Sequence, residues 1–136
     1  MVCSGLQDEL EKVQNRAARF VSSNYSYEPG SMSSILSQLG WKSLKQRRKE
    51  SRLILLYKGL KGKAKIPTND LVKPTRRSRT HHDLTFVIPH ARSDCYKFSF
   101  IPNTLRDWNG LPSSVIACAE SAQNQVNKFR DLVKSD

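Results

Sequence analysis

The sequence is poor in cysteine and has no long hydrophobic run. Its three cysteines, Cys3, Cys95 and Cys118, are odd in number and far apart, which argues against a disulfide framework and against a zinc ribbon. The longest apolar cluster, residues 53–57, is far shorter than the roughly 20 residues of a membrane-spanning helix. The N-terminus lacks the apolar stretch of a signal peptide. We therefore expect a small intracellular protein, nuclear or cytoplasmic, without membrane contact.

Acidic residues are scarce in one part of the chain only. The formal net charge is +11. Residues 42–79 contain fourteen Lys or Arg and only two acids, Glu50 and Asp70, whereas the remainder is almost neutral. Segregated charge of this kind is typical of a surface that meets a polyanion. The alternative is a solvated surface whose charge only keeps the chain in solution.

The N-terminal part of the sequence predicts three helices. Apolar residues at steps of four and three along residues 6–21 form the stripe of an amphipathic helix. Residues 31–39 predict a short second helix, which Gly40 ends at the C′ position. Ser43 is placed to cap a third helix over residues 44–60. We expect these three helices to make the main core.

The predicted third helix has two unlike halves. Its first half, "LKQRRKESR", is strongly basic and is expected to be exposed, whereas its second half, "LILLYKGL", is apolar on nearly every side and is expected to be buried. Positive charge in the first turns of a helix opposes the macrodipole, by roughly 0.3–1 kcal/mol per charge. A bound polyanion would offset that cost.

Beyond the third helix, the pattern changes to a loop and then to strands. Residues 61–83 have no sustained period and many charges, which predicts a basic loop. Residues 84–88 and 95–101 have strand composition and predict a β-hairpin. We expect one face of the second strand to be buried, the alternative being that its aromatic rings stack on unpaired bases. The three aromatic residues of that face are Tyr96, Phe98 and Phe100.

Trp108 stands among polar, turn-forming residues. It falls three residues after Leu105 on one face of a short helix that starts near Pro102, and Asn109 with Gly110 would end this helix in the left-handed conformation. We interpret Trp108 as a structural anchor against the hairpin aromatics, whose indole N–H needs a partner once it is buried. The alternative is contact with a molecule outside the chain.

The pattern as a whole predicts an α+β fold that is mostly helical. Its parts are three N-terminal helices, a basic loop, a small β-hairpin and a C-terminal helix that Ser121 caps. The corresponding ranges are a helical segment over 1–61, a basic loop or linker over 62–83, and a hairpin with C-terminal helices over 84–136. We expect these parts to form one structural unit.

The candidate metal ligands form no convincing pattern. His81, His82, His90 and Cys95 are of suitable types, but adjacent histidines in a strand point apart and no second cysteine completes a tetrahedral set at short spacing. A Cys–His nucleophilic pair would have to meet in space, and no local pattern supports one. We expect no metal, no cofactor and no enzymatic activity in this chain.

Four motifs carry a family resemblance. In chain order they are "LEKVQNRAARFV", "LSQLGWKSLKQRRKESRLILLYKGL", "PTRRSRTHH" and "YKFSFIPNTLRDWNGLP". Together they resemble the C-terminal region of reverse transcriptases from non-LTR retrotransposons of the LINE, jockey-like type. The resemblance runs from about Leu10 to Pro112, with a weaker match to Phe129. In that family, this segment lies downstream of the fingers, palm and thumb of an RNA-directed DNA polymerase.

The polymerase machinery of that family has no counterpart in the sequence. Reverse transcription needs carboxylates that hold two divalent metals, and the family places an adjacent Asp pair after an aromatic residue in its palm. The chain contains no such pair and has no room for the endonuclease domain of these elements. The resemblance therefore implies a non-catalytic fragment of a transposable-element protein, with contact to element RNA or target DNA as the natural inference.

The basic residues of the third helix and of the loop are the predicted phosphate ligands. Lys and Arg that neutralise phosphates release condensed counterions, which gives affinity with little sequence information. The "RRK" and "RRSR" runs are also consistent with nuclear-import signals. The alternative function is a protein interaction module, or an inert transposon-derived fragment, that packed against the missing polymerase. The predicted ligands are Lys45, Arg47, Arg48, Lys49, Arg52, Arg76, Arg77 and Arg79.

Overall fold

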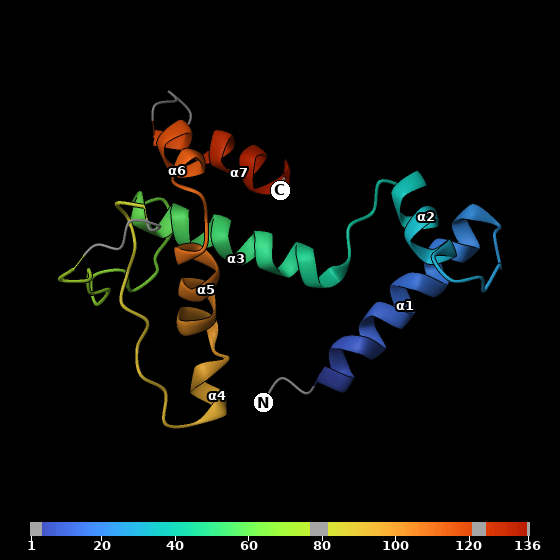
Figure 1. Cartoon of the computed structure of the whole chain (residues 1–136), viewed down its shortest axis with the longest axis horizontal. Helices are drawn as coiled ribbons and strands as arrows, with labels where there is room; N and C mark the ends of the chain where they lie inside the picture. Colours follow the sequence, from blue (N-terminus) through green and yellow to red (C-terminus); the bar gives the residue numbers. More distant parts are fainter. Residues whose placement is uncertain (1–3, 77–81, 121–124, 136) are drawn as a thin grey trace. The chain divides into compact units, whose positions relative to one another are not determined.

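The computed structural model describes residues 4–76, 82–120 and 125–135, and within these ranges it contains helices and no strand (Figure 1). The prediction of a mostly helical chain is confirmed, whereas the predicted α+β fold with a β-hairpin is wrong. The chain divides into two compact units, Met1–Arg48 and Lys49–Asp136. The helices are α1 (Ser4–Ser22), α2 (Ser31–Gln38), α3 (Leu44–Leu60), α4 (Asp94–Lys97), α5 (Phe100–Asn109), α6 (Ser113–Glu120) and α7 (Gln125–Ser135).

The helices of the first unit end in left-handed turns. Gly40 follows α2 with φ +65°, and its N–H bonds to the Ser37 carbonyl while the Trp41 N–H bonds to the Leu36 carbonyl. This is the Schellman motif, so the predicted C′ role of Gly40 is confirmed. The residue after α1, Ser23, has φ 51°, a conformation that glycine adopts more easily.

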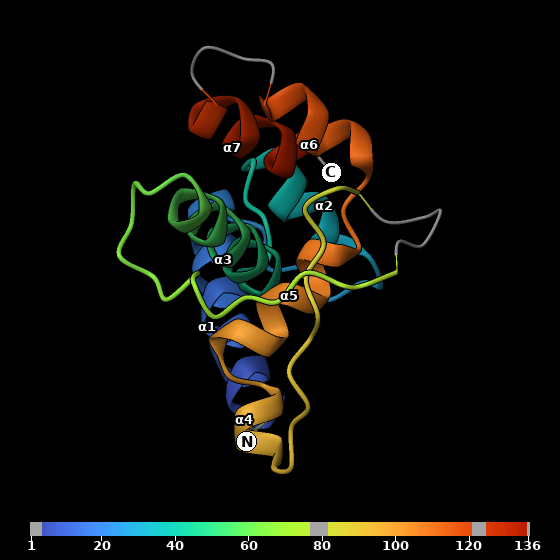
Figure 2. The ribbon, with the colours of Figure 1, turned by 90° about the vertical axis from the view of Figure 1, so that its left-hand side faces the viewer.

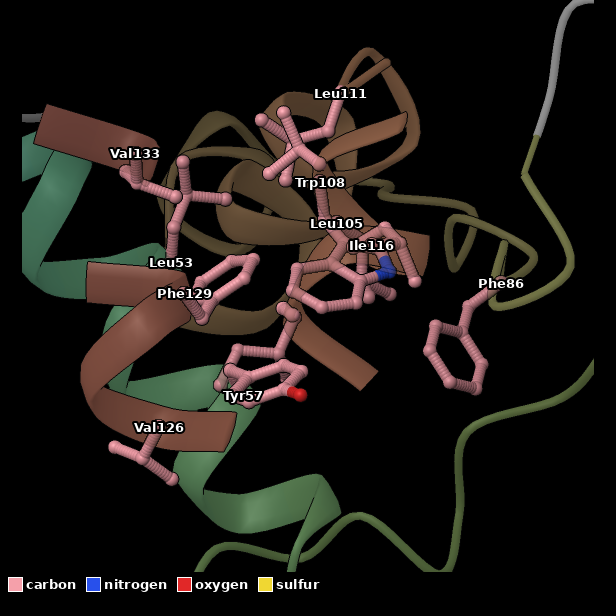
Figure 3. Close-up of a cluster of buried hydrophobic side chains, with 13 residues drawn as sticks. Leu53, Tyr57, Phe86, Leu105, Trp108, Leu111, Ile116, Val126, Phe129 and Val133 are labelled. Atoms are coloured by element: carbon pink, nitrogen blue, oxygen red, sulfur yellow. The ribbon is translucent and has the colours of Figure 1, made fainter. Parts of the chain in front are cut away.

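The main hydrophobic core lies in the second unit (Figure 3). The second half of α3 contributes to it, together with α5, α6 and α7. The Tyr57 ring stacks on Phe129 with 4.2 Å between ring centroids, and Trp108 lies 5.6 Å from Phe129. Among the described residues of the first unit, the only buried hydrophobic ones are Ala18 and Ile35. The expectation that the first three helices make the main core is therefore wrong, since only α3 contributes.

The predicted second strand instead lies mostly in two helices, α4 and the first turn of α5. Ser93 caps α4, where its hydroxyl accepts a hydrogen bond from the Tyr96 N–H. Ser99 precedes α5 in an extended conformation, and its hydroxyl donates to the Tyr96 carbonyl over 2.7 Å. Tyr96 and Phe98 are exposed, so the expectation that they are buried is wrong. Stacking of these rings on unpaired bases, the alternative, stays an untested hypothesis.

The predicted first strand begins in a turn and forms no regular element, and its backbone is bound by side chains of α5. The amide of Asn109 accepts a hydrogen bond from the Phe86 N–H over 3.0 Å and donates one to the Phe86 carbonyl over 2.7 Å. The indole N–H of Trp108 donates to the Leu84 carbonyl over 2.7 Å. One amide side chain therefore pairs with Phe86 as a neighbouring strand would, which removes the need for a hairpin.

The C-terminal helices differ in part from the prediction. α5 begins at Phe100, so Pro102 lies inside its first turn, where a missing N–H costs no hydrogen bond. Gly110 has φ −82°, so the predicted left-handed end of this helix is wrong. α6 was not predicted, and it lies beside α7 in both views (Figures 1 and 2). Ser121, the predicted start of the last helix, lies outside the described residues.

No helix within the described ranges combines the length and the apolar character that are needed to cross a membrane.

Candidate nucleic-acid interface

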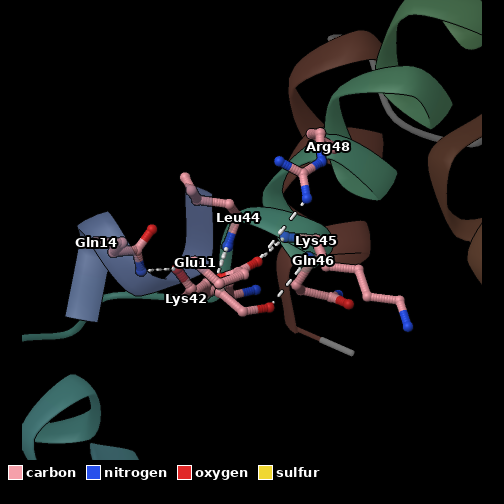
Figure 4. Close-up of polar contacts among 8 residues, drawn as sticks. Glu11, Gln14, Lys42, Leu44, Lys45, Gln46 and Arg48 are labelled. Carbon is pink, nitrogen blue, oxygen red and sulfur yellow. Dashed lines mark hydrogen bonds and ion pairs between the residues drawn. The ribbon is translucent and has the colours of Figure 1, made fainter. Parts of the chain in front are cut away.

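The N-terminus of α3, next to the first predicted phosphate ligands, is capped within the first unit (Figure 4). The Ser43 hydroxyl accepts a hydrogen bond from the Gln46 N–H over 3.2 Å, which confirms the predicted cap. The Glu11 carboxylate of α1 accepts two more, from the N–H of Leu44 over 3.2 Å and of Lys45 over 2.7 Å. A carboxylate at this end of a helix interacts favourably with the macrodipole. A carboxylate of the chain itself thus offsets part of the unfavourable interaction that a bound polyanion would also offset.

Replacing Glu11 with Ala is expected to lower the free energy of unfolding of the first unit by about 1 kcal/mol, because two amides of α3 lose their acceptor. Urea unfolding followed by far-UV circular dichroism measures this loss. Asp8→Ala is the matched control, since Asp8 is an exposed acid on the same helix and caps no helix end in the described structure. Equal losses in the two variants would show that the cap contributes nothing.

Two of the predicted phosphate ligands form ion pairs with acids of the chain. A guanidinium nitrogen of Arg48 lies 3.9 Å from the Glu11 carboxylate, within the first unit. In the second unit, Arg52 of α3 donates a hydrogen bond of 2.8 Å to Asp107 of α5. These carboxylates partly neutralise the arginines, so both arginines are less available to a phosphate than an exposed cation is.

Three predicted ligands at the start of α3 are exposed. They are Lys45 and Arg47 in the first unit and Lys49 in the second. No carboxylate within the described ranges forms an ion pair with any of them. Exposed cations of this kind are hydrated and surrounded by mobile anions, which a nucleic-acid backbone displaces on binding.

The loop that follows α3 carries the second group of cations. It packs against the helix at the buried Gly59, where a Cβ atom would lie 3.1 Å from the Cβ of Ile66. Of the ligands predicted here, Arg76 is exposed, whereas Arg77 and Arg79 lie outside the described residues. Three further lysines belong to the same charge-rich stretch but were not among the predicted ligands. The exposed cations of the loop are Lys63, Lys65, Lys73 and Arg76.

No protein-family model, curated protein or solved structure matches this chain. The resemblance to reverse transcriptases of LINE-type elements therefore rests on its four sequence motifs and stays a prediction. The exposure and the pairing of the basic residues carry the functional argument.

The histidines that were considered as metal ligands have other surroundings. His82 is buried, and its Nε2–H donates to the Trp108 carbonyl over 2.9 Å. Its ring also meets the Trp108 indole edge to face, with 5.6 Å between centroids. His81 lies outside the described residues. Among the residues that the structure describes, no three His, Cys, Asp or Glu side chains come together in a way that could hold a metal ion.

Proposed function

We propose that the chain binds the phosphate backbone of RNA or DNA through the exposed cations of residues 42–79. One observation carries this proposal. Lys45, Arg47 and Lys49 are exposed without a carboxylate partner in the described structure, although two neighbouring arginines are paired with acids. The free energy of phosphate binding is most favourable at cations that no acid of the chain neutralises, because the phosphate there replaces mobile counterions.

The resemblance to reverse transcriptases supports two parts of this proposal: that the polyanion is RNA or DNA, and that the chain is not catalytic. A tail of a LINE-type reverse transcriptase has element RNA and target DNA within reach, and the chain lacks the paired aspartates that polymerisation requires. We propose that the chain acts as a non-catalytic binding segment, in the nucleus or the cytoplasm. Contact with phosphates alone implies little preference between sequences.

The combined substitution Lys45→Gln, Arg47→Gln and Lys49→Gln tests the proposal. Binding of a fluorescent oligonucleotide, followed by anisotropy, is expected to weaken because three phosphate contacts are lost. The slope of log K against log salt should become shallower by about 0.9 for each contact on duplex DNA. The overall fold is expected to persist because all three side chains are exposed.

A matched control separates these positions from net charge. Arg92, Arg106 and Lys128 are exposed and lie outside the basic stretch. Their combined replacement by Gln removes the same three charges from the formal +11, and it should leave the affinity and the salt slope close to those of the unaltered chain. Equal weakening by both triple variants would mean that overall charge, and not this surface, drives binding.

A second candidate function is protein association, including packing against the polymerase part of a parent protein. It is favoured by one observation: several large apolar side chains of α1 are exposed. Exposed contiguous apolar surface is typical of an interaction site.

A further inference from the structure

The face of α1 that packs inside the first unit is its more polar one. Ala18 is fully buried there, and the Glu11 carboxylate caps α3. The Gln14 side chain donates a hydrogen bond of 2.9 Å to the Lys42 carbonyl. α1 therefore contributes mostly polar contacts to its own unit.

The apolar stripe of α1 points away from that packed face. It comprises Leu6, Leu10, Val13, Ala17 and Phe20, and the exposed fractions of its large members run from 53% for Leu10 to 74% for Phe20. An amphipathic helix normally buries such a stripe, because each exposed side chain of this size forgoes roughly 1.5–3 kcal/mol of burial. The stripe is thus an apolar surface without an occupant in the described structure.

The spacing of the stripe is that of a coiled coil. Its members follow one another at steps of four, three, four and three, which is the heptad alternation of d and a positions. In this register, Glu9 and Arg16 both fall at the g position beside the stripe. Such a seam is suited to a second helix of the same kind.

The charges beside the stripe select the orientation of that second helix. In a parallel pair of α1 helices, g residues face e residues, which here are the uncharged Gln14 and Val21. In an antiparallel pair, g faces g, so Glu9 of each copy meets Arg16 of the other. The antiparallel pair therefore gains two opposite-charge contacts, and its helix dipoles also attract.

We propose that the chain self-associates through an antiparallel pair of α1 helices, with the stripe Leu6, Leu10, Val13, Ala17 and Phe20 as the seam. The inference is independent of nucleic-acid binding, since no residue of the basic stretch takes part. Lys12 lies 2.7 Å from Glu9 and lowers the pKa of its carboxyl by hydrogen bonding and by its charge, so Glu9 stays ionised near neutral pH.

Sedimentation equilibrium of the full chain tests the proposal. We expect the average mass to approach twice that of the monomer as the concentration rises. Val13→Glu places a charge at the centre of the seam on an already exposed side chain, so it should yield a monomer with unchanged helix content by circular dichroism. A monomer at all concentrations in the unaltered chain would overturn the proposal, whether the stripe is solvated or covers another protein.

Charge reversal tests the orientation. Glu9→Arg and Arg16→Glu each turn two attractive contacts into repulsive ones, so each should raise the dissociation constant of the dimer by about tenfold. The double reversal should restore it, and a mixture of the two single variants should form a heterodimer. Asp8→Arg is the control, since Asp8 is exposed on α1 and lies away from the seam. If the charge reversals leave the dissociation constant of the dimer unchanged, the antiparallel assignment is wrong.

Glu9→Gln and Arg16→Gln keep the test valid if a reversed charge unfolds α1. Each neutral variant removes the two attractive contacts without adding repulsion, so each should weaken the dimer less than the corresponding reversal does. Neutral variants that bind as tightly as the unaltered chain, with normal helix content, would count against the proposed charge contacts.

Discussion

Trp108→Ala is expected to lower the free energy of unfolding of the second unit by about 3–5 kcal/mol. The side chain is fully buried, and its ring lies 5.6 Å from Phe129 and 6.2 Å from Tyr57 between centroids. Its removal leaves a large cavity at the centre of the core and leaves the Leu84 carbonyl without its donor. A loss of this size is a large part of the stability of a small domain.

Urea unfolding of the full chain measures this loss. Trp41→Ala is the matched control, because it removes the same side chain from an exposed position. We expect Trp41→Ala to cost less than about 1 kcal/mol. Similar costs for the two variants would contradict the central place of Trp108 in the core.

Trp108→Phe separates the structural role of the tryptophan from binding. The smaller ring keeps part of the packing but loses the hydrogen bond to Leu84, so a loss of about 1–3 kcal/mol is expected. Salt-dependent binding of nucleic acid should be unchanged, since the buried ring cannot touch a ligand. Loss of binding in a folded Trp108→Phe protein would restore the alternative that the residue contacts an outside molecule.

Asn109→Asp is expected to lower the free energy of unfolding by about 1–3 kcal/mol. A carboxylate still accepts the hydrogen bond from the Phe86 N–H, but it cannot donate to the Phe86 carbonyl, which it then repels. The added charge also lies at the last residue of α5, where negative charge is unfavourable. The segment around Phe86 should then separate from α5.

Two variants identify the cause of that loss. Asn127→Asp adds the same charge at an exposed position of α7 and should be nearly neutral. Asn109→Leu keeps the size of the side chain without its charge, and it should destabilise because it makes neither hydrogen bond. Hydrogen exchange at the Phe86 amide follows the segment directly, and undiminished protection in Asn109→Leu would show that the amide does not hold it.

Local signals explain why part of the fold could be predicted. Periodic apolar residues mark α1, and Gly40 and Ser43 mark helix ends through backbone geometry that depends only on near neighbours. The prediction of a hairpin is wrong because the alternation of aromatic and polar residues over 95–101 also fits two short helical turns. What decides between them is the pairing of Phe86 with Asn109, a contact between residues far apart in the chain.

The candidate site also combines features that local sequence predicts with features that depend on distant contacts. Charge density along the sequence predicts a basic surface, and it is independent of the fold. It does not predict which cations are free, since the partners of Arg48 and Arg52 come from distant helices, α1 and α5. Whether an amphipathic stripe faces its own core is also a tertiary property, and α1 turns its polar face inward.

The salt dependence of binding tests the central claim most directly. The affinity of the full chain for RNA and for DNA is measured by gel shift or anisotropy at several salt concentrations. We predict binding at low salt to both, with log K falling linearly as log salt rises, by about 0.7 to 0.9 for each phosphate contact. No binding at low salt, or an affinity that salt does not change, would contradict the claim that exposed cations of residues 42–79 bind a phosphate backbone.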